Sequence, residues 1–227
     1  MSTAHLLYGT VLLVCLIVAV RLWQSQRVLY LLLLTLTILA LVYDNYVVGF
    51  GRFIGEGDLL QSLNLPRYLL HAFFTPLMIM VGFFLARNAG VQWARSNVAL
   101  YIFGGITVAM IALGTMVDVV NLDLEFAIQG DTMRYANAAS EGPPIPAIVS
   151  IILLIGCGIS IWRNSRWVWL MVGAIVMFIA SAGGSAFGVL TNLGELALAI
   201  SLIYTAKQFP YENLSATFAR GSSPRAT

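Results

Sequence analysis

The chain has 227 residues, of which 59% are hydrophobic and only 10% are charged, and its formal net charge is +2. Soluble domains usually carry about 25% charged residues, so a soluble fold of this composition would expose a large apolar surface to water. A bilayer solvates such a surface. The composition therefore excludes a soluble globular protein and predicts an integral membrane protein. Cys15 and Cys157 lie inside apolar runs without a CxxC motif, which indicates buried thiols rather than a disulfide or zinc site.

Apolar runs long enough to cross a membrane recur along the chain. A hydrocarbon core about 30 Å thick requires about 20 apolar residues in a helix. Runs of that length predict an all-α bundle of seven transmembrane helices, at roughly residues 5–23, 28–48, 67–87, 97–117, 145–163, 167–187 and 191–208. We expect one domain, residues 1–209, and a short disordered cytoplasmic tail, residues 210–227.

Positive charges occur in alternate connections, which predicts the orientation of the bundle. Connections of one side carry Arg21, Arg27, Arg87, Arg95, Arg163, Arg166, Lys207, Arg220 and Arg225, with Glu212 as their single acid. The other side carries all remaining acids and only Arg52, Arg67 and Arg134 as cations. By the positive-inside rule the N-terminus lies outside and the C-terminus in the cytoplasm. No organelle address is visible, so we expect a bacterial plasma membrane, with a thylakoid membrane as the alternative.

Ionisable side chains gather at one depth, in the outer half of the predicted bundle. Such groups are costly inside a membrane, so each one needs a partner or a function. Arg67, His71 and Thr75 recur at intervals of four and therefore share one helix face. His5 is interpreted as a solvated helix end. The candidate catalytic residues are His71 as the general acid or base, Asp44 as its orienting partner, and Glu195 or Asp118 as a second acid or base.

Candidate substrate-binding groups surround these residues. Four glycines between Gly49 and Gly57 indicate a tight loop followed by a short interfacial helix, where Arg52 and Arg67 could hold a phosphate or lipid headgroup. Asn45, Thr75 and Asn192 are the polar neighbours of the candidate catalytic residues. The acidic segment 118–144 is expected to form a long loop over the outer mouth of the bundle. Small residues including the pair Gly184 and Gly188 indicate close helix packing, or alternatively homodimerisation.

Three functions fit this pattern. The first is a membrane-embedded enzyme that acts on a lipid or isoprenoid by acid–base chemistry. The second is a non-catalytic subunit or assembly factor of a membrane complex, and the third is a small proton-coupled transporter, which the scarcity of polar residues in the inner half disfavours. Membrane lipids are the expected partners, a homo-oligomer or complex is possible, and nucleic acid is not expected. No metal site is predicted and the cofactor is unknown. Retinal is excluded because the only lysine, Lys207, lies at the cytoplasmic end.

Overall fold

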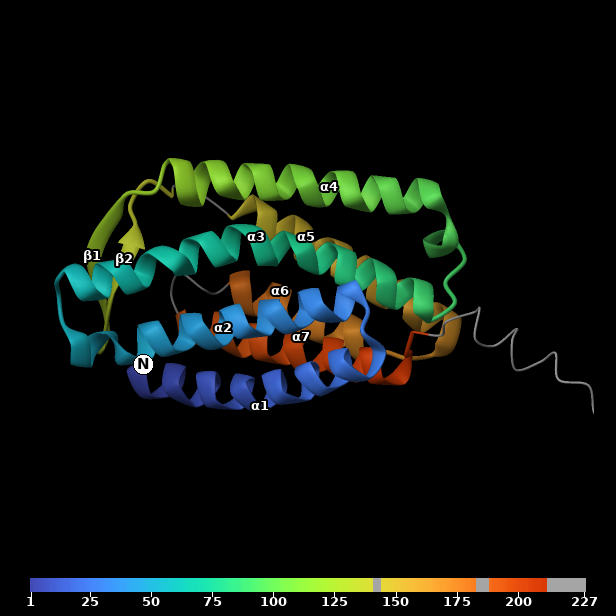
Figure 1. Cartoon of the computed structure of the whole chain (residues 1–227), viewed down its shortest axis with the longest axis horizontal. Helices are drawn as coiled ribbons and strands as arrows, with labels where there is room; N and C mark the ends of the chain where they lie inside the picture. Colours follow the sequence, from blue (N-terminus) through green and yellow to red (C-terminus); the bar gives the residue numbers. More distant parts are fainter. Residues whose placement is uncertain (141–143, 183–187, 212–227) are drawn as a thin grey trace, which may run out of the picture.

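The computed structural model describes residues 1–140, 144–182 and 188–211. These residues form seven α-helices, which confirms the predicted number, and Figure 1 shows them side by side along one long axis. The predicted tail from residue 212 onward, and Gly184 of the predicted small-residue pair, lie outside the described residues. The helices are α1 (Ser2–Gln26), α2 (Leu29–Ile54), α3 (Asp58–Asn88), α4 (Asn97–Thr115), α5 (Ile145–Ser165), α6 (Trp169–Ala182) and α7 (Gly188–Gln208).

Length and composition make this a helical membrane bundle. Six of the described helices are long and apolar enough to cross a bilayer. The exception, α6, has 14 described residues, which corresponds to about 21 Å at 1.5 Å per residue. Its predicted span extended to residue 187, and residues 183–187 are not described. The chain is therefore an integral, multi-pass membrane protein.

Six helices form a closed ring and the seventh lies outside it. Around the ring α1 contacts α2, α2 contacts α3, α3 contacts α5, and α5, α6 and α7 lead back to α1. Helix α4 packs mainly against the outer side of α3 (Figure 1), and half of its large apolar side chains are exposed. The ring surrounds the polar residues of α2, α3 and α7, while α4 is positioned to face lipid.

The connection between α2 and α3 differs from the predicted glycine-rich loop. Helix α2 continues to Ile54, and α3 already begins at Asp58 and contains Pro66. Gly49 and Gly51 lie within α2, where their lack of a side chain allows neighbouring segments to approach closely. A Cβ on Gly49 would lie 2.7 Å from Leu6 Cδ2, and one on Gly51 would collide with the Met133 carbonyl oxygen. Gly49 and Gly51 therefore permit packing within α2, whereas Gly55 and Gly57, with φ of +79° and +146°, form the short connection, and the predicted short helix after it is the first part of α3.

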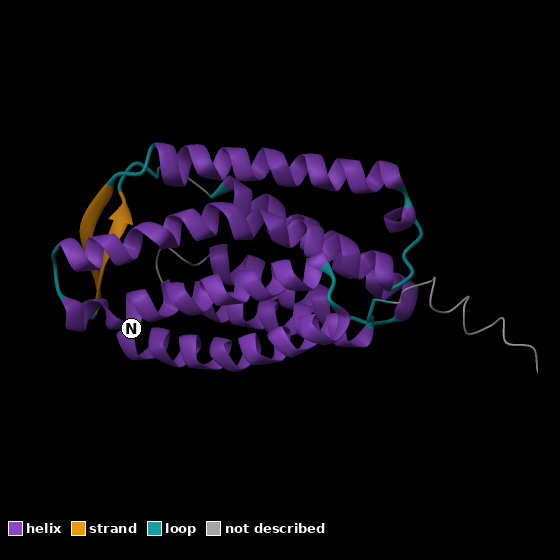
Figure 2. Cartoon of the chain, in the orientation of Figure 1, coloured by secondary structure: helices purple, strands orange, loops and turns teal. Residues whose placement is uncertain are grey.

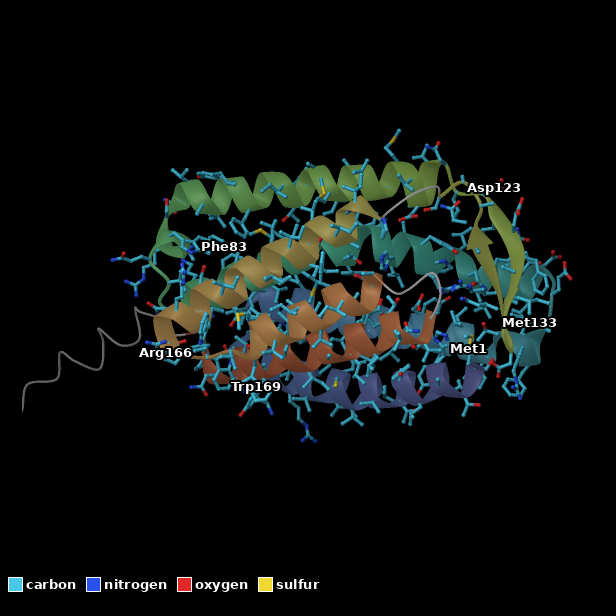
Figure 3. All side chains as sticks on the ribbon, turned by 180° about the vertical axis from the view of Figure 1, so that it is seen from behind. Met1, Phe83, Asp123, Met133, Arg166 and Trp169 are labelled. Atoms are coloured by element: carbon cyan, nitrogen blue, oxygen red, sulfur yellow. The ribbon has the colours of Figure 1, made fainter. Side chains whose placement is uncertain are left out.

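The expected long loop over the bundle is largely a β-hairpin. Strands β1 (Leu124–Gln129) and β2 (Thr132–Asn137) pair antiparallel, with Gln129 opposite Thr132, and are the only strands in the described part of the chain (Figure 2). A two-residue connection joins them, in which Gly130 has φ +61°. Gly-Asp is a recognised hairpin signal. The hairpin lies at the end of the bundle where the N-terminus lies, as Met1 and Met133 show in Figure 3.

The opposite end, which carries Arg166 and Trp169 in Figure 3, is closely packed. Phe83 is fully buried and its ring lies 5.2 Å from that of Phe103 and 6.1 Å from that of Trp93. Leu34, Ile161 and Leu202 are also fully buried. Because this half is filled by apolar side chains, the cavities of the bundle lie toward the hairpin end.

Candidate functional site

An ion pair between α2 and α3 organises the polar residues. Arg67 Nε donates to Asp44 Oδ1 over 2.7 Å, and Arg67 Nη1 donates to Asn64 Oδ1 over 2.6 Å. Asn64 is fully buried and donates in turn to the Leu60 carbonyl over 2.7 Å. This arrangement replaces the expected pairing of Asp44 with His71. One helical turn separates Arg67 from His71, and the longer Arg67 side chain reaches the carboxylate through its Nε, while its Nη1 donates to Asn64.

A cavity of about 300 Å³ lies between α2, α3, α7 and the hairpin. Charged or titratable side chains from five different parts of the chain line it. They are Asp44 of α2, Arg67 and His71 of α3, Asp118 after α4, Arg134 of β2 and Glu195 of α7. The structure therefore brings all four candidate catalytic residues to one cavity, together with Arg67 and Thr75.

A second cavity, of about 480 Å³, lies on the hairpin side of the ion pair. Asp44, Arg67 and Arg134 line both cavities, so the two meet at the ion pair. The remaining wall comes from His5 on α1, from Ile128 and Gln129 on β1, and from Asn192 on α7. The hairpin is therefore part of the wall of the site.

Tyr68 fixes the hairpin to α3. Its hydroxyl donates to the Tyr135 carbonyl over 3.0 Å and accepts from the Asn137 N–H, also over 3.0 Å. This anchorage positions Arg134, one residue earlier on β2, at the cavities. Burial lowers the pKa of the Arg134 guanidinium, and the nearby positive charge of Arg67 lowers it further. Sequence reasoning missed Tyr68 and Arg134 as site residues. The strand pattern on either side of Gly130-Asp131 was the sequence signal that could have predicted the hairpin and so placed Arg134 on a strand.

His71 and Asp118 also border a side pocket of about 150 Å³ between α3, α4 and the start of α5. Thr75, Leu113 and Pro146 complete its wall. Within the described chain the His71 ring has no hydrogen bond, and it is solvent-exposed. The ring is therefore available to hydrogen-bond a bound molecule.

Glu195 joins the polar cavity to an apolar pocket of about 70 Å³. This pocket lies between α2, α3, α5 and α7, with Ile38, Met78, Leu154 and Leu198 in its wall. Glu195 Oε2 is buried and has no hydrogen-bond partner among the described residues. A buried polar atom without a hydrogen-bond partner is unfavourable. The Glu195 carboxyl is therefore suited to bind a ligand or a proton.

His5 is buried, contrary to the expected solvated helix end. Its Nδ1 lies 3.0 Å from Asn192 Nδ2 and 3.4 Å from Asn45 Oδ1. Asn45 is fully buried and also donates to the Leu41 carbonyl over 3.0 Å. The three side chains link α1, α2 and α7, and only His5 and Asn192 reach the second cavity.

Arg52 lies away from both cavities. Its Nη1 donates to Asp131 Oδ2 over 3.0 Å, and the N-terminal amine of Met1 forms an ion pair with Oδ1 of the same carboxylate. The hydrogen bond from the amine, followed by one from the Ser2 N–H, holds the pKa of Asp131 well below its usual range. Arg52 thus ties the tip of the hairpin to α2.

Comparison with protein-family models, with curated proteins and with solved structures finds no match for this chain. The described residues also contain no group of three or more His, Cys, Asp or Glu side chains placed to hold a metal ion.

Proposed function

We propose that the chain is a membrane-embedded enzyme that acts on a lipid or isoprenoid amphiphile by acid–base chemistry. The observation that carries the proposal is the continuity of one polar cavity with an apolar pocket: His71, Thr75 and Glu195 line both. An amphiphile matches this arrangement, since its polar part requires hydrogen-bond partners and its chain requires an apolar wall.

The proposed roles follow from the contacts of each side chain. His71 transfers the proton, because its ring has no hydrogen bond within the described chain and borders three pockets. Glu195 is the second acid or base, on the opposite helix. Asp44 orients Arg67 through their 2.7 Å hydrogen bond, and Asp118 assists His71 from the side pocket. General acid–base groups of this kind contribute roughly 10²- to 10⁴-fold to a rate.

We further propose that the site lies in the outer leaflet, with the N-terminus outside. The connections at the end opposite the hairpin carry Arg27, Arg95 and Arg166, and two of the helices end there in left-handed arginines, Arg27 and Arg166. Positive connections favour the cytoplasmic side. Single cysteines placed at Glu56 and at Ser165, in a chain whose Cys15 and Cys157 are replaced by Ala, test this with an impermeant thiol reagent on intact cells. Labelling at the Ser165 position alone would show that the C-terminal ends of α1 and α5 lie outside, which would contradict the proposed orientation.

A non-catalytic subunit is the second candidate, and α4 favours it. Val98, Tyr101, Ile102 and Val108 are exposed on α4, and no described atom lies within 4 Å of a Cβ built on Gly104 or Gly105. Such a face accommodates either lipid or a partner helix. Transport has less support, since the half of the ring opposite the hairpin is filled by fully buried apolar residues.

The enzyme proposal is tested with the full chain reconstituted in vesicles made from the total lipid extract of its expression host. Lipids are compared by mass spectrometry before and after incubation. The proposal predicts a mass change in one lipid class with the wild-type chain, which is lost with His71→Gln and retained with Arg95→Gln at the opposite end of the bundle. An unchanged lipid profile with the wild type, or equal conversion by His71→Gln, would contradict it.

A further inference from the structure

The guanidinium of Arg134 lies in the wall of the site, and its N–H donors are only partly hydrogen-bonded within the protein. Its Nη2 donates to Gln129 Oε1 over 3.1 Å, whereas its Nε is buried without a partner in the described part of the chain. A buried donor without an acceptor is unfavourable. The contact with Gln129, which is neutral, leaves the charge of the guanidinium uncompensated.

Arg67 lines the same two cavities, and its charge is already shared. Its Nε and Nη1 are occupied by Asp44 and Asn64. Among the described residues of the second cavity, Arg67 and Arg134 are the cationic side chains and Asp44 is the only acid. Glu195 and Asp118 line the first cavity and not the second. The hairpin side of the site therefore carries one more positive than negative side chain.

We propose that Arg67 and Arg134 together bind the anionic head, a phosphate or carboxylate, of the amphiphile on which the site acts. This inference rests on the proposed function and names the class of its substrate. Guanidinium groups bind such oxyanions through paired N–H donors. The second cavity, about 480 Å³, accommodates the head, and the bond that reacts then lies by His71 and Glu195 in the first cavity.

The position of Arg134 also explains the attachment of the hairpin. Tyr68 holds the backbone of Tyr135 and Asn137, and the Arg52–Asp131 contact holds the turn. Both ends of β2 are thereby fixed. Binding is stronger when the binding group is already held in place, because less conformational freedom is lost.

The test uses the purified full chain in a neutral maltoside detergent, with binding measured by isothermal titration calorimetry. The probes are dodecyl phosphate, dodecanol and inorganic phosphate. We expect dodecyl phosphate to bind to the wild type at least ten-fold more tightly than dodecanol or inorganic phosphate. Arg134→Gln should weaken it about ten-fold or more, Arg134→Lys should weaken it less, and Arg95→Gln, an exposed residue at the end opposite the hairpin, should leave it unchanged.

The outcomes separate this inference from the proposed function. If dodecanol and dodecyl phosphate bind equally and Arg134→Gln has no effect, the proposal of an anionic head is contradicted. The proposal of an amphiphile-binding site is then retained. No binding of either amphiphile would overturn both. Inorganic phosphate binding as tightly as dodecyl phosphate would overturn the amphiphile as the source of the anion. Unfolding temperatures show that the variants are folded, and Arg134→Lys provides a second folded comparison.

Discussion

Arg67 Nε lies 2.7 Å from Asp44 Oδ1, and this contact joins α2 to α3 at the point where the two polar cavities meet. The Arg67 side chain is only 10% exposed and that of Asp44 31%. The pair thus has two roles: the charges of Asp44 and Arg67 compensate each other, and the contact fixes the Arg67 guanidinium, which borders both cavities.

Asp44→Ala should destabilise the bundle. Removing one partner of a buried ion pair leaves the other charge uncompensated, which costs about 3–5 kcal/mol when both are fully buried. Partial exposure of Asp44 reduces this, and we expect a loss of about 2 kcal/mol. Thermal unfolding in detergent measures it. Asp58→Ala, at the exposed start of α3, is the control, and equal unfolding temperatures for the two variants would argue against the pair.

Glu195→Gln should leave the fold intact and remove activity. Because Glu195 Oε2 is buried without a partner among the described residues, the neutral amide should be tolerated at least as well as the acid. We expect an equal or higher unfolding temperature, with a stability gain of about 1 kcal/mol or less. Lipid conversion should fall at least ten-fold. Glu125→Gln on β1 serves as the control, and unchanged conversion by Glu195→Gln would remove Glu195 from the mechanism.

Gly51→Ala should displace the hairpin. A Cβ at Gly51 would collide with the backbone carbonyl of Met133, so β2 or α2 has to move. Overpacking of this kind costs about 1–3 kcal/mol. Gly104→Ala is matched to it, because Gly104 is also helical but has open space around it in the described structure, and it should be neutral or stabilising by up to about 1 kcal/mol. Equal effects of the two changes on unfolding would be inconsistent with this packing.

The hairpin should loosen in acid because of Asp131. Its pKa is lowered in the folded chain, so its contribution is complete above the unfolded pKa of about 4 and is lost progressively as the pH falls from that value toward the lower folded pKa. A spin label on Gln129→Cys, with both native cysteines replaced by Ala, should become more mobile below about pH 4. With Asp131→Asn the label should already be mobile at pH 7. Equal mobility of the two chains at both pH values would exclude this role of Asp131.

The helices could be predicted from the sequence because a bilayer requires each spanning segment to satisfy its own backbone, so apolar length alone locates it. The partner of Asp44 could not be predicted. Arg67 and His71 lie on one face of α3, and only the rotation and height of α3 against α2 determine which of them reaches the carboxylate. Gly49 and Gly51 misled for a related reason, since their packing against Leu6 and Met133 involves residues distant in sequence.

Native mass spectrometry of the full chain, released from nanodiscs made with the host lipid extract, measures whether an amphiphile lies between the polar cavity and the apolar pocket. Thr75 lines the first cavity, the side pocket and the apolar pocket, so Thr75→Phe should fill the site, whereas Val108→Phe on the exposed side of α4 should not. We predict a retained lipid of defined mass on the wild type and on Val108→Phe, and its loss from Thr75→Phe. Equal retention by all three chains, or a bare wild-type chain, would contradict the account.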